Sequence, residues 1–138
     1  MNILKKFRGL INEAIERGGL TVGLGKNDYL KVKEFKSGYM VGGYSEEYRA
    51  AIDDIHSMNI AGLYLILLDL HKQAAQAAGF SQYEYTSGLY LGFWVDNGYL
   101  YIEISKKFRS KEAALIEASE RKQLAIYDCK NNKSIYLK

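Results

Sequence analysis

The sequence contains no proline, one cysteine and only two histidines in 138 residues. A single cysteine, Cys129, excludes an intrachain disulfide and any zinc site with several cysteine ligands. His56 and His71 alone are too few to supply the three or four converging ligands of a typical metal site. These absences predict a protein without a metal or other cofactor that has no need of an oxidising compartment.

Long hydrophobic runs are absent as well. The longest apolar stretch, Leu63–Leu68, ends at Asp69, whereas a membrane-spanning helix needs about 20 apolar residues. The first eight residues mix charged and apolar side chains, which is not typical of a signal peptide. We therefore expect no membrane association and a cytoplasmic location.

The composition is that of one globular domain covering residues 1–138. Apolar residues make up 48% of the chain and charged residues 25%, which are globular rather than disordered proportions. A chain of this length buries enough surface to fold without covalent cross-links. The net charge of +3 is modest and does not by itself indicate an anionic partner.

The first half of the chain predicts two helical regions with short strands between them. Apolar residues recur on one side of an amphipathic helix over residues 2–17, which Gly18 and Gly19 end. Short strands are expected near residues 20–22 and 39–41. Ser45 followed by two glutamates predicts a helix start there, with a break near Asn59 or Gly62 and a main core helix up to residue 78.

The last third predicts a hairpin, helix, hairpin module over residues 88–138. Strands 89–95 and 99–104 flank Asn97-Gly98, the strongest short hairpin signal. Ser110 is the expected cap of a helix over residues 111–123, and strands 124–127 and 134–137 follow. Because the strands come as hairpins, we predict an α+β fold with an antiparallel sheet and helices packed on one face.

Catalytic chemistry is weakly represented. Asp96, Glu103 and Asp128 are the carboxylates of the C-terminal strands, and a pair of them is the best candidate for acid–base work. Aspartate is also common at strand ends and turns for local reasons. Cys129 lacks a neighbouring histidine that would activate it. We therefore expect a binding protein rather than an enzyme, and a small hydrolase stays as an alternative.

A basic run beside aromatic residues supports a second hypothesis, binding of nucleic acid. Lys106, Lys107 and Arg109 follow the strand that carries Tyr99 and Tyr101, and single-stranded nucleic acid is bound by such combinations of charge and stacking faces. The alternative interpretation of this run is a solvated loop leading into a helix.

Several segments, read together, resemble small accessory proteins of bacteriophages and prophages. The segments are Gly38-Tyr39-Met40-Val41, Gly92-Phe93-Trp94-Val95-Asp96, Tyr101-Ile102-Glu103-Ile104-Ser105, Glu112-Ala113-Ala114 and Gln123-Leu124-Ala125-Ile126-Tyr127-Asp128. Glu103 departs from the pattern, which usually has aspartate at this position. The resemblance implies a phage-encoded inhibitor of a bacterial defence system, active in the host cytoplasm, which binds a bacterial defence protein or a nucleotide second messenger.

A weaker similarity to anti-Thoeris sponge proteins lies in the aromatic hairpin followed by a helix with a late arginine. It implies that Trp94 or Tyr101 stacks on a base and that Arg121 meets phosphate. The alternatives are that Trp94 belongs to the core and that Arg121 interacts with the helix dipole. The candidate ligand-binding residues are Tyr39, Trp94, Tyr99, Tyr101, Lys106, Lys107, Arg109 and Arg121. A homo-oligomer is also expected, because a tyrosine-rich hairpin at a sheet edge favours pairing.

Overall fold

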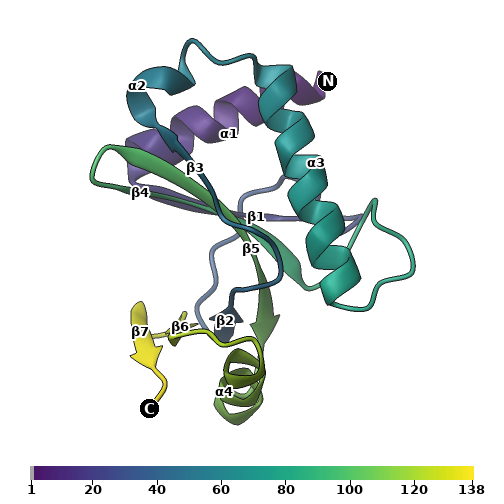
Figure 1. Cartoon of the computed structure of the whole chain (residues 1–138), viewed down its shortest axis with the longest axis vertical. Coiled ribbons are helices and arrows are strands. Elements are labelled where there is room, and N and C mark those ends of the chain that lie inside the picture. The colour runs from purple at the N-terminus through teal and green to yellow at the C-terminus, as the bar shows by residue number, and fades with distance from the viewer. Residues whose placement is uncertain (1) are drawn as a thin grey trace.

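The computed structural model describes residues 2–138, which form a seven-stranded antiparallel sheet with helices (Figure 1). The predicted α+β class is confirmed. The strands are β1 (Gly19–Gly23), β2 (Tyr39–Val41), β3 (Tyr48–Ala51), β4 (Leu89–Asp96), β5 (Tyr99–Phe108), β6 (Ala125–Asp128) and β7 (Lys133–Tyr136). The helices are α1 (Ile3–Arg17), α2 (Ile52–Ile55), α3 (Ile60–Ala77) and α4 (Lys111–Glu120).

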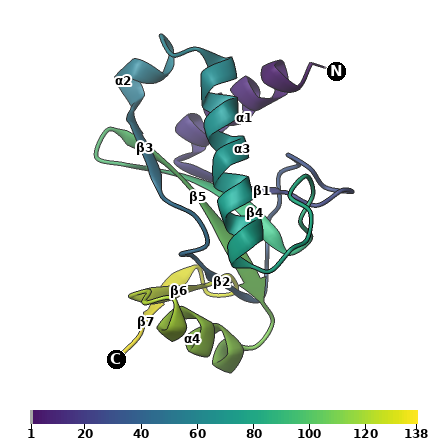
Figure 2. The same cartoon turned by 45° about the vertical axis from the view of Figure 1, so that its right-hand side comes forward.

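Strand β5 is the central strand of the sheet and pairs with three others. The strand order is β1, β4, β5, β2, β6, β7, and β3 also pairs with β5. The first residues of β5 pair with β3, and its last three residues pair with β2. Strand β5 therefore joins the two ends of the molecule (Figure 2). Helices α1 and α3 lie by the upper strands, and α4 lies by β2 and β6 at the lower end.

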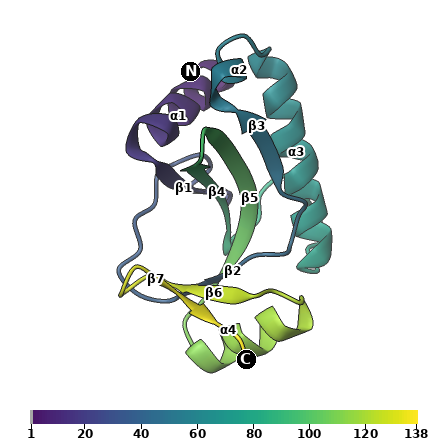
Figure 3. The ribbon, with the colours of Figure 1, turned by 60° about the vertical axis from the view of Figure 1, so that its left-hand side comes forward.

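One sheet face forms the core with the helices. Alternate residues of β4 and β5 are buried, including Leu91, Phe93, Leu100 and Ile102, because successive side chains of a strand point to opposite faces. They join the buried faces of α1, α3 and α4 in one hydrophobic cluster. In Figure 3, α3 lies to one side of β5, and the segment joining β1 to β2 runs on the other side.

Helix ends follow the local sequence signals. The Asn2 side chain accepts hydrogen bonds from the first turn of α1, and Gly18 ends that helix with φ of 85°. Asn59 caps α3 and Ser110 caps α4. The α4 helix ends at Glu120, three residues before the predicted end.

The predicted helix beginning at Ser45 is wrong. Residues Tyr48–Ala51 form β3 instead and pair with Ile102–Tyr99 of β5. The Ser45 hydroxyl accepts a hydrogen bond from the Ile104 N–H rather than from a helical turn. Pairing with the long strand β5 therefore outweighs the local capping signal, and only the single helical turn α2 precedes α3.

The β4–β5 hairpin lies in the middle of the sheet, so it offers no free edge through which two copies of the chain could pair. We expected this tyrosine-rich hairpin at a sheet edge, but β1 pairs with β4, and both β2 and β3 pair with β5. The strands at the ends of the sheet order are β1 and β7. Homo-oligomer formation stays a prediction without that support.

Candidate functional site

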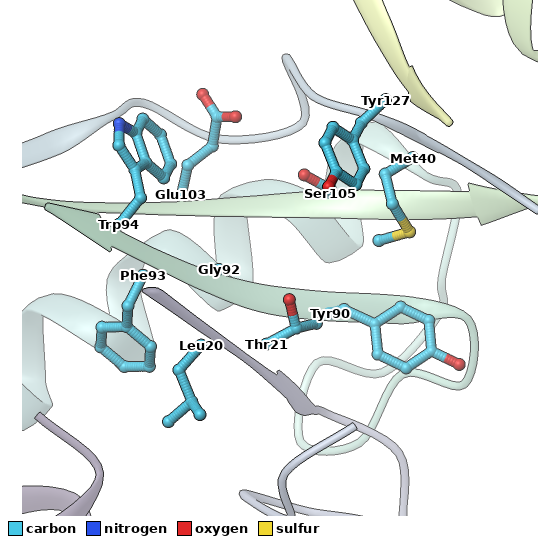
Figure 4. A pocket seen from close by; sticks show the side chains of 10 residues that line it. All are labelled: Leu20, Thr21, Met40, Tyr90, Gly92, Phe93, Trp94, Glu103, Ser105 and Tyr127. Carbon is cyan, nitrogen blue, oxygen red and sulfur yellow. The ribbon is translucent and has the colours of Figure 1, made fainter. Parts of the chain in front are cut away.

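The sheet face opposite the core, here called the aromatic face, carries the candidate site. Its floor comes from β1, β4 and β5, with additions from β2 and β6 (Figure 4). A shallow pocket of about 200 Å³ lies over it. Its outward-facing residues are Thr21, Met40, Tyr90, Gly92, Trp94, Glu103, Ser105 and Tyr127.

The register of the hairpin builds an aromatic pair at one end of the pocket. Asn97 and Gly98 have positive φ, as a two-residue hairpin turn requires, and this turn places Trp94 opposite Tyr101. Their rings are stacked with planes 4° apart and centroids 5.3 Å apart. Tyr101 therefore holds the Trp94 ring in place, and Trp94 presents its outer face to the pocket.

A cation borders this pair. Arg49 of β3 is the cross-strand neighbour of Tyr101, and its guanidinium carbon lies 4.7 Å from the centroid of the Tyr99 ring. Tyr99 and Tyr101 are themselves 6.5 Å apart between centroids. Planar groups are attracted to such an arrangement by stacking and by cation–π interaction.

Glycine creates the hollow next to the aromatic pair. Gly92 lies between Thr21 on β1 and Glu103 on β5, and its missing side chain leaves the floor of the pocket open. A β-carbon at Gly92 would meet only the Glu103 carbonyl oxygen, at an ordinary 3.6 Å. Packing of the neighbouring strands therefore does not require glycine at position 92.

Glu103 stands beside this hollow and close to Trp94 (Figure 4). Burial raises the pKa of its carboxyl to about 7, and the nearby negative charge of Glu47 adds to the effect. None of the ion pairs formed within residues 2–138 includes Glu103. The site therefore holds a carboxyl that changes charge near neutral pH.

The loop between β2 and β3 accounts for the burial of Glu103. Pairing of β5 with β2 reaches Lys106 and pairing with β3 begins at Ile102, so the chain arches past the residues between them. At Gly42, an added β-carbon would lie 2.6 Å from the Glu103 Oε1 atom and 3.3 Å from the Gln123 Oε1 atom. Gly42 thus leaves the space that the carboxyl occupies.

A strap formed by residues 31–38 closes the other end of the aromatic face. Phe35 packs edge-on against Tyr90, with centroids 4.8 Å apart, and the Lys107 ammonium lies 4.0 Å from the Phe35 centroid. A second pocket of about 380 Å³ adjoins the first through Thr21, Met40 and Tyr127. Its lining adds the cations Arg17, Lys33 and Lys36.

The structure separates the residues predicted as ligand-binding into groups. Trp94, Tyr99 and Tyr101 lie together, and Lys107 lies at the far end of the same face. The basic run is not a loop, because Lys106 and Lys107 belong to β5, and Lys106 packs over Phe108. Arg109 is exposed just after the strand.

Two of the predicted residues have other surroundings. Tyr39 is partly buried against the core. The Arg121 guanidinium forms an ion pair with Glu117, donates to the Ala77 carbonyl and lies 3.7 Å from the centroid of the Tyr44 ring. Joint binding of one ligand by Arg121 and Trp94 stays a prediction that these contacts do not favour.

Gly92, Glu103 and Arg49 were not among the residues predicted to bind a ligand, and Glu103 was named only as a candidate for acid–base chemistry. The signal for the first two was present, because a two-residue turn at Asn97-Gly98 fixes which residues face each other. Arg49 was hidden by the wrong helix prediction. Phe35 reaches Tyr90 from far along the chain, and no local pattern indicates that contact.

Residues 2–138 lack both a metal-binding cluster and a membrane-spanning helix. Within them, no group of three or more histidine, cysteine, aspartate or glutamate side chains is placed to hold a metal ion. No helix in the same range has the length and apolar character needed to cross a membrane.

Neither a family model, nor a curated protein, nor a solved structure matches the chain. The geometry of the aromatic face therefore carries the functional inference.

Proposed function

We propose that the protein binds a nucleotide on the aromatic face, with the base against the Trp94–Tyr101 pair, and that it acts by sequestering this ligand. The stacked pair beside the hollow over Gly92 is the observation that carries the proposal. A base needs a flat apolar surface and polar groups at its edge, and both occur here within one pocket.

The size of the pocket favours a single base. Pockets for drug-sized ligands measure about 300–1,000 Å³, and the hollow over Gly92 is about 200 Å³. The adjoining pocket with Arg17, Lys33 and Lys36 offers a place for an anionic group of the same ligand. Arg17 and Lys33 already pair with acidic residues, so Lys36 is the cation best placed to meet a phosphate.

The biological setting follows from the resemblance to phage accessory proteins. A binding protein that removes a nucleotide second messenger would prevent a bacterial defence system from responding. A stoichiometric inhibitor of this kind needs affinity and no catalytic group, which agrees with the stacking surface and the hollow. A bacterial defence protein as the direct target is the other form of the same proposal.

Calorimetric titration with ribonucleoside monophosphates tests the proposal. Trp94→Ala should weaken binding by about 5- to 150-fold, because stacking of one base contributes about 1–3 kcal/mol. Tyr101→Ala should weaken it less, because Tyr101 supports the Trp94 ring from the side away from the base. Tyr136→Ala is the matched control, since this tyrosine lies on β7 and is 71% exposed. Equal affinities for all four proteins would overturn the proposal.

Single-stranded nucleic acid is the second candidate ligand, and Lys107 at the end of the aromatic face favours it. Nucleic-acid affinity must fall steeply with salt, with a slope of about −0.7 for each phosphate neutralised on a single strand. Replacing Lys107 and Arg109 by alanine should reduce this slope. A slope near zero with oligonucleotides would leave the mononucleotide as the ligand.

A further inference from the structure

Resting on the proposed nucleotide site, we propose that Glu103 determines which base is bound and that it selects guanine. Glu103 pairs with Gly92 across the hairpin and lines the same pocket, and its carboxyl lies at the β5 side of the hollow, where Gly42 leaves room for it. It also lies next to Trp94, the stacking surface (Figure 4). A base stacked on Trp94 over Gly92 would present its edge to this carboxyl.

The chemistry of the carboxyl distinguishes the bases. An ionised carboxylate accepts hydrogen bonds and donates none. The pairing edge of guanine presents two neighbouring N–H donors, whereas adenine and cytosine present one donor beside one acceptor. Two parallel bonds to the carboxylate are therefore available to guanine alone among these three bases.

Hydroxyl groups complete the match. Thr21 lies in the same cross-strand row as Gly92 and Glu103, and Ser105 follows two residues after Glu103 on the same face of β5. A hydroxyl can donate to the guanine carbonyl oxygen, which neighbours the two N–H groups. The pocket thus combines a double acceptor with adjacent donors.

Occupation of the site should depend on pH, because the Glu103 carboxyl must be ionised to accept both bonds. Its pKa is raised to about 7 by burial and by the negative charge of Glu47. The other groups around it are neutral, with Trp94 and Gly92 on β4 and Gln123 after α4. Arg121, beyond Gly43, is held by Glu117. Guanine affinity should rise from pH 6 to pH 8, by about tenfold for each pH unit below the pKa.

At a pH below the pKa of Glu103, the preference for guanine over adenine should decrease. A protonated carboxyl carries one donor and one acceptor, which suits adenine or cytosine instead of guanine. Glutamine has the same pattern at every pH, so Glu103→Gln imitates the protonated state without adding or removing bulk. Glu120→Gln, at the exposed end of α4, is the control for loss of one negative charge.

The test measures binding of guanosine and adenosine monophosphates to the whole chain at pH 6 and pH 8. The wild type and Glu120→Gln should prefer guanosine monophosphate at pH 8, and Glu103→Gln should reduce this preference by about ten- to hundredfold and remove its pH dependence. Binding of both nucleotides with equal, pH-independent affinity would overturn the role of Glu103 and leave the base site intact. Binding of neither nucleotide would overturn the site itself. Circular dichroism of each variant confirms that the fold is kept.

Discussion

Trp94 and Tyr101 face each other across the β4–β5 hairpin with their rings stacked 4° from parallel on the sheet face that the helices leave free. A pair of this kind stabilises the hairpin through cross-strand contact. The same pair borders a hollow floored by glycine and a carboxyl with a raised pKa. That combination is the basis for proposing a binding surface here instead of ordinary strand packing.

Filling the hollow should abolish binding without harming the fold. Gly92 has ordinary φ and room for a β-carbon, so Gly92→Ala should leave stability unchanged or raise the free energy of unfolding by up to about 1 kcal/mol. Nucleotide affinity should fall at least tenfold, because the methyl group occupies the floor of the pocket. Urea unfolding and calorimetric titration measure the two effects.

Gly9→Ala is the control for this prediction. Gly9 lies in the exposed face of α1 with nothing within 4 Å of an added β-carbon, so the same change should raise stability by a similar amount and leave binding intact. Equal affinities of Gly92→Ala and the wild type would show that the ligand does not enter the hollow.

The helices and strands could be predicted from the sequence more accurately than the pairing of the strands in the sheet. The hairpin, its tyrosine face and the helix cap at Ser110 could be predicted, because turn chemistry and alternation are local. The strand β3 could not, since its pairing with β5 joins residues about 50 positions apart. Local capping preference at Ser45 gave the wrong answer there.

The candidate site was predictable to the same extent. The two-residue turn places Trp94 opposite Tyr101 and Gly92 opposite Glu103. The raised pKa of Glu103 depends on the passage of Gly42 beside it and on the charge of Glu47. Those contacts are set by the tertiary path of the chain, which leaves no periodic signal in the sequence.

Glu103 should lower stability at high pH. Its folded pKa of about 7 lies above the unfolded value of 4.5, so the folded state binds the proton more tightly, and this contribution is lost as pH rises from 4.5 to 7. Glu103→Gln should therefore be more stable than the wild type at pH 8, by up to about 3 kcal/mol, with little difference at pH 4.5.

Urea unfolding of the wild type and Glu103→Gln between pH 4.5 and pH 8 measures this effect as a difference. A difference in the free energy of unfolding that stays constant across the range would show that the pKa of Glu103 is not raised.

His71 should act in the opposite direction. It is 1% exposed, its Nε2 atom is 2.7 Å from the Thr86 hydroxyl oxygen, and burial lowers its pKa to about 4. The unfolded chain binds the proton more tightly, so this contribution is complete above pH 6.5 and is lost as pH falls toward 4.

Acidification toward pH 4 should lower the free energy of unfolding by roughly 3 kcal/mol through His71. His71→Gln keeps a hydrogen-bonding side chain for Thr86 and should remove this part of the pH dependence. Unfolding curves for both proteins at pH 4.5 and pH 7 provide the comparison. Parallel decreases in the two proteins on acidification would assign the acid sensitivity to other groups.

Arg121 should prove structural rather than ligand-binding. Its guanidinium links α4 to the end of α3 through Glu117 and Ala77 and covers the Tyr44 ring. Arg121→Ala should lower the free energy of unfolding by about 1–3 kcal/mol and leave nucleotide affinity unchanged under folding conditions. A selective loss of affinity with unaltered stability would instead support the phosphate-binding role implied by the resemblance to sponge proteins.

The most direct test of the base site uses the fluorescence of Trp94, the only tryptophan in the chain. Titration with guanosine monophosphate at pH 8 should change the Trp94 emission saturably, because the base stacks on the indole, and Gly92→Ala should weaken this response at least tenfold. An emission spectrum that does not change up to millimolar nucleotide, in a protein shown to be folded, would contradict the account.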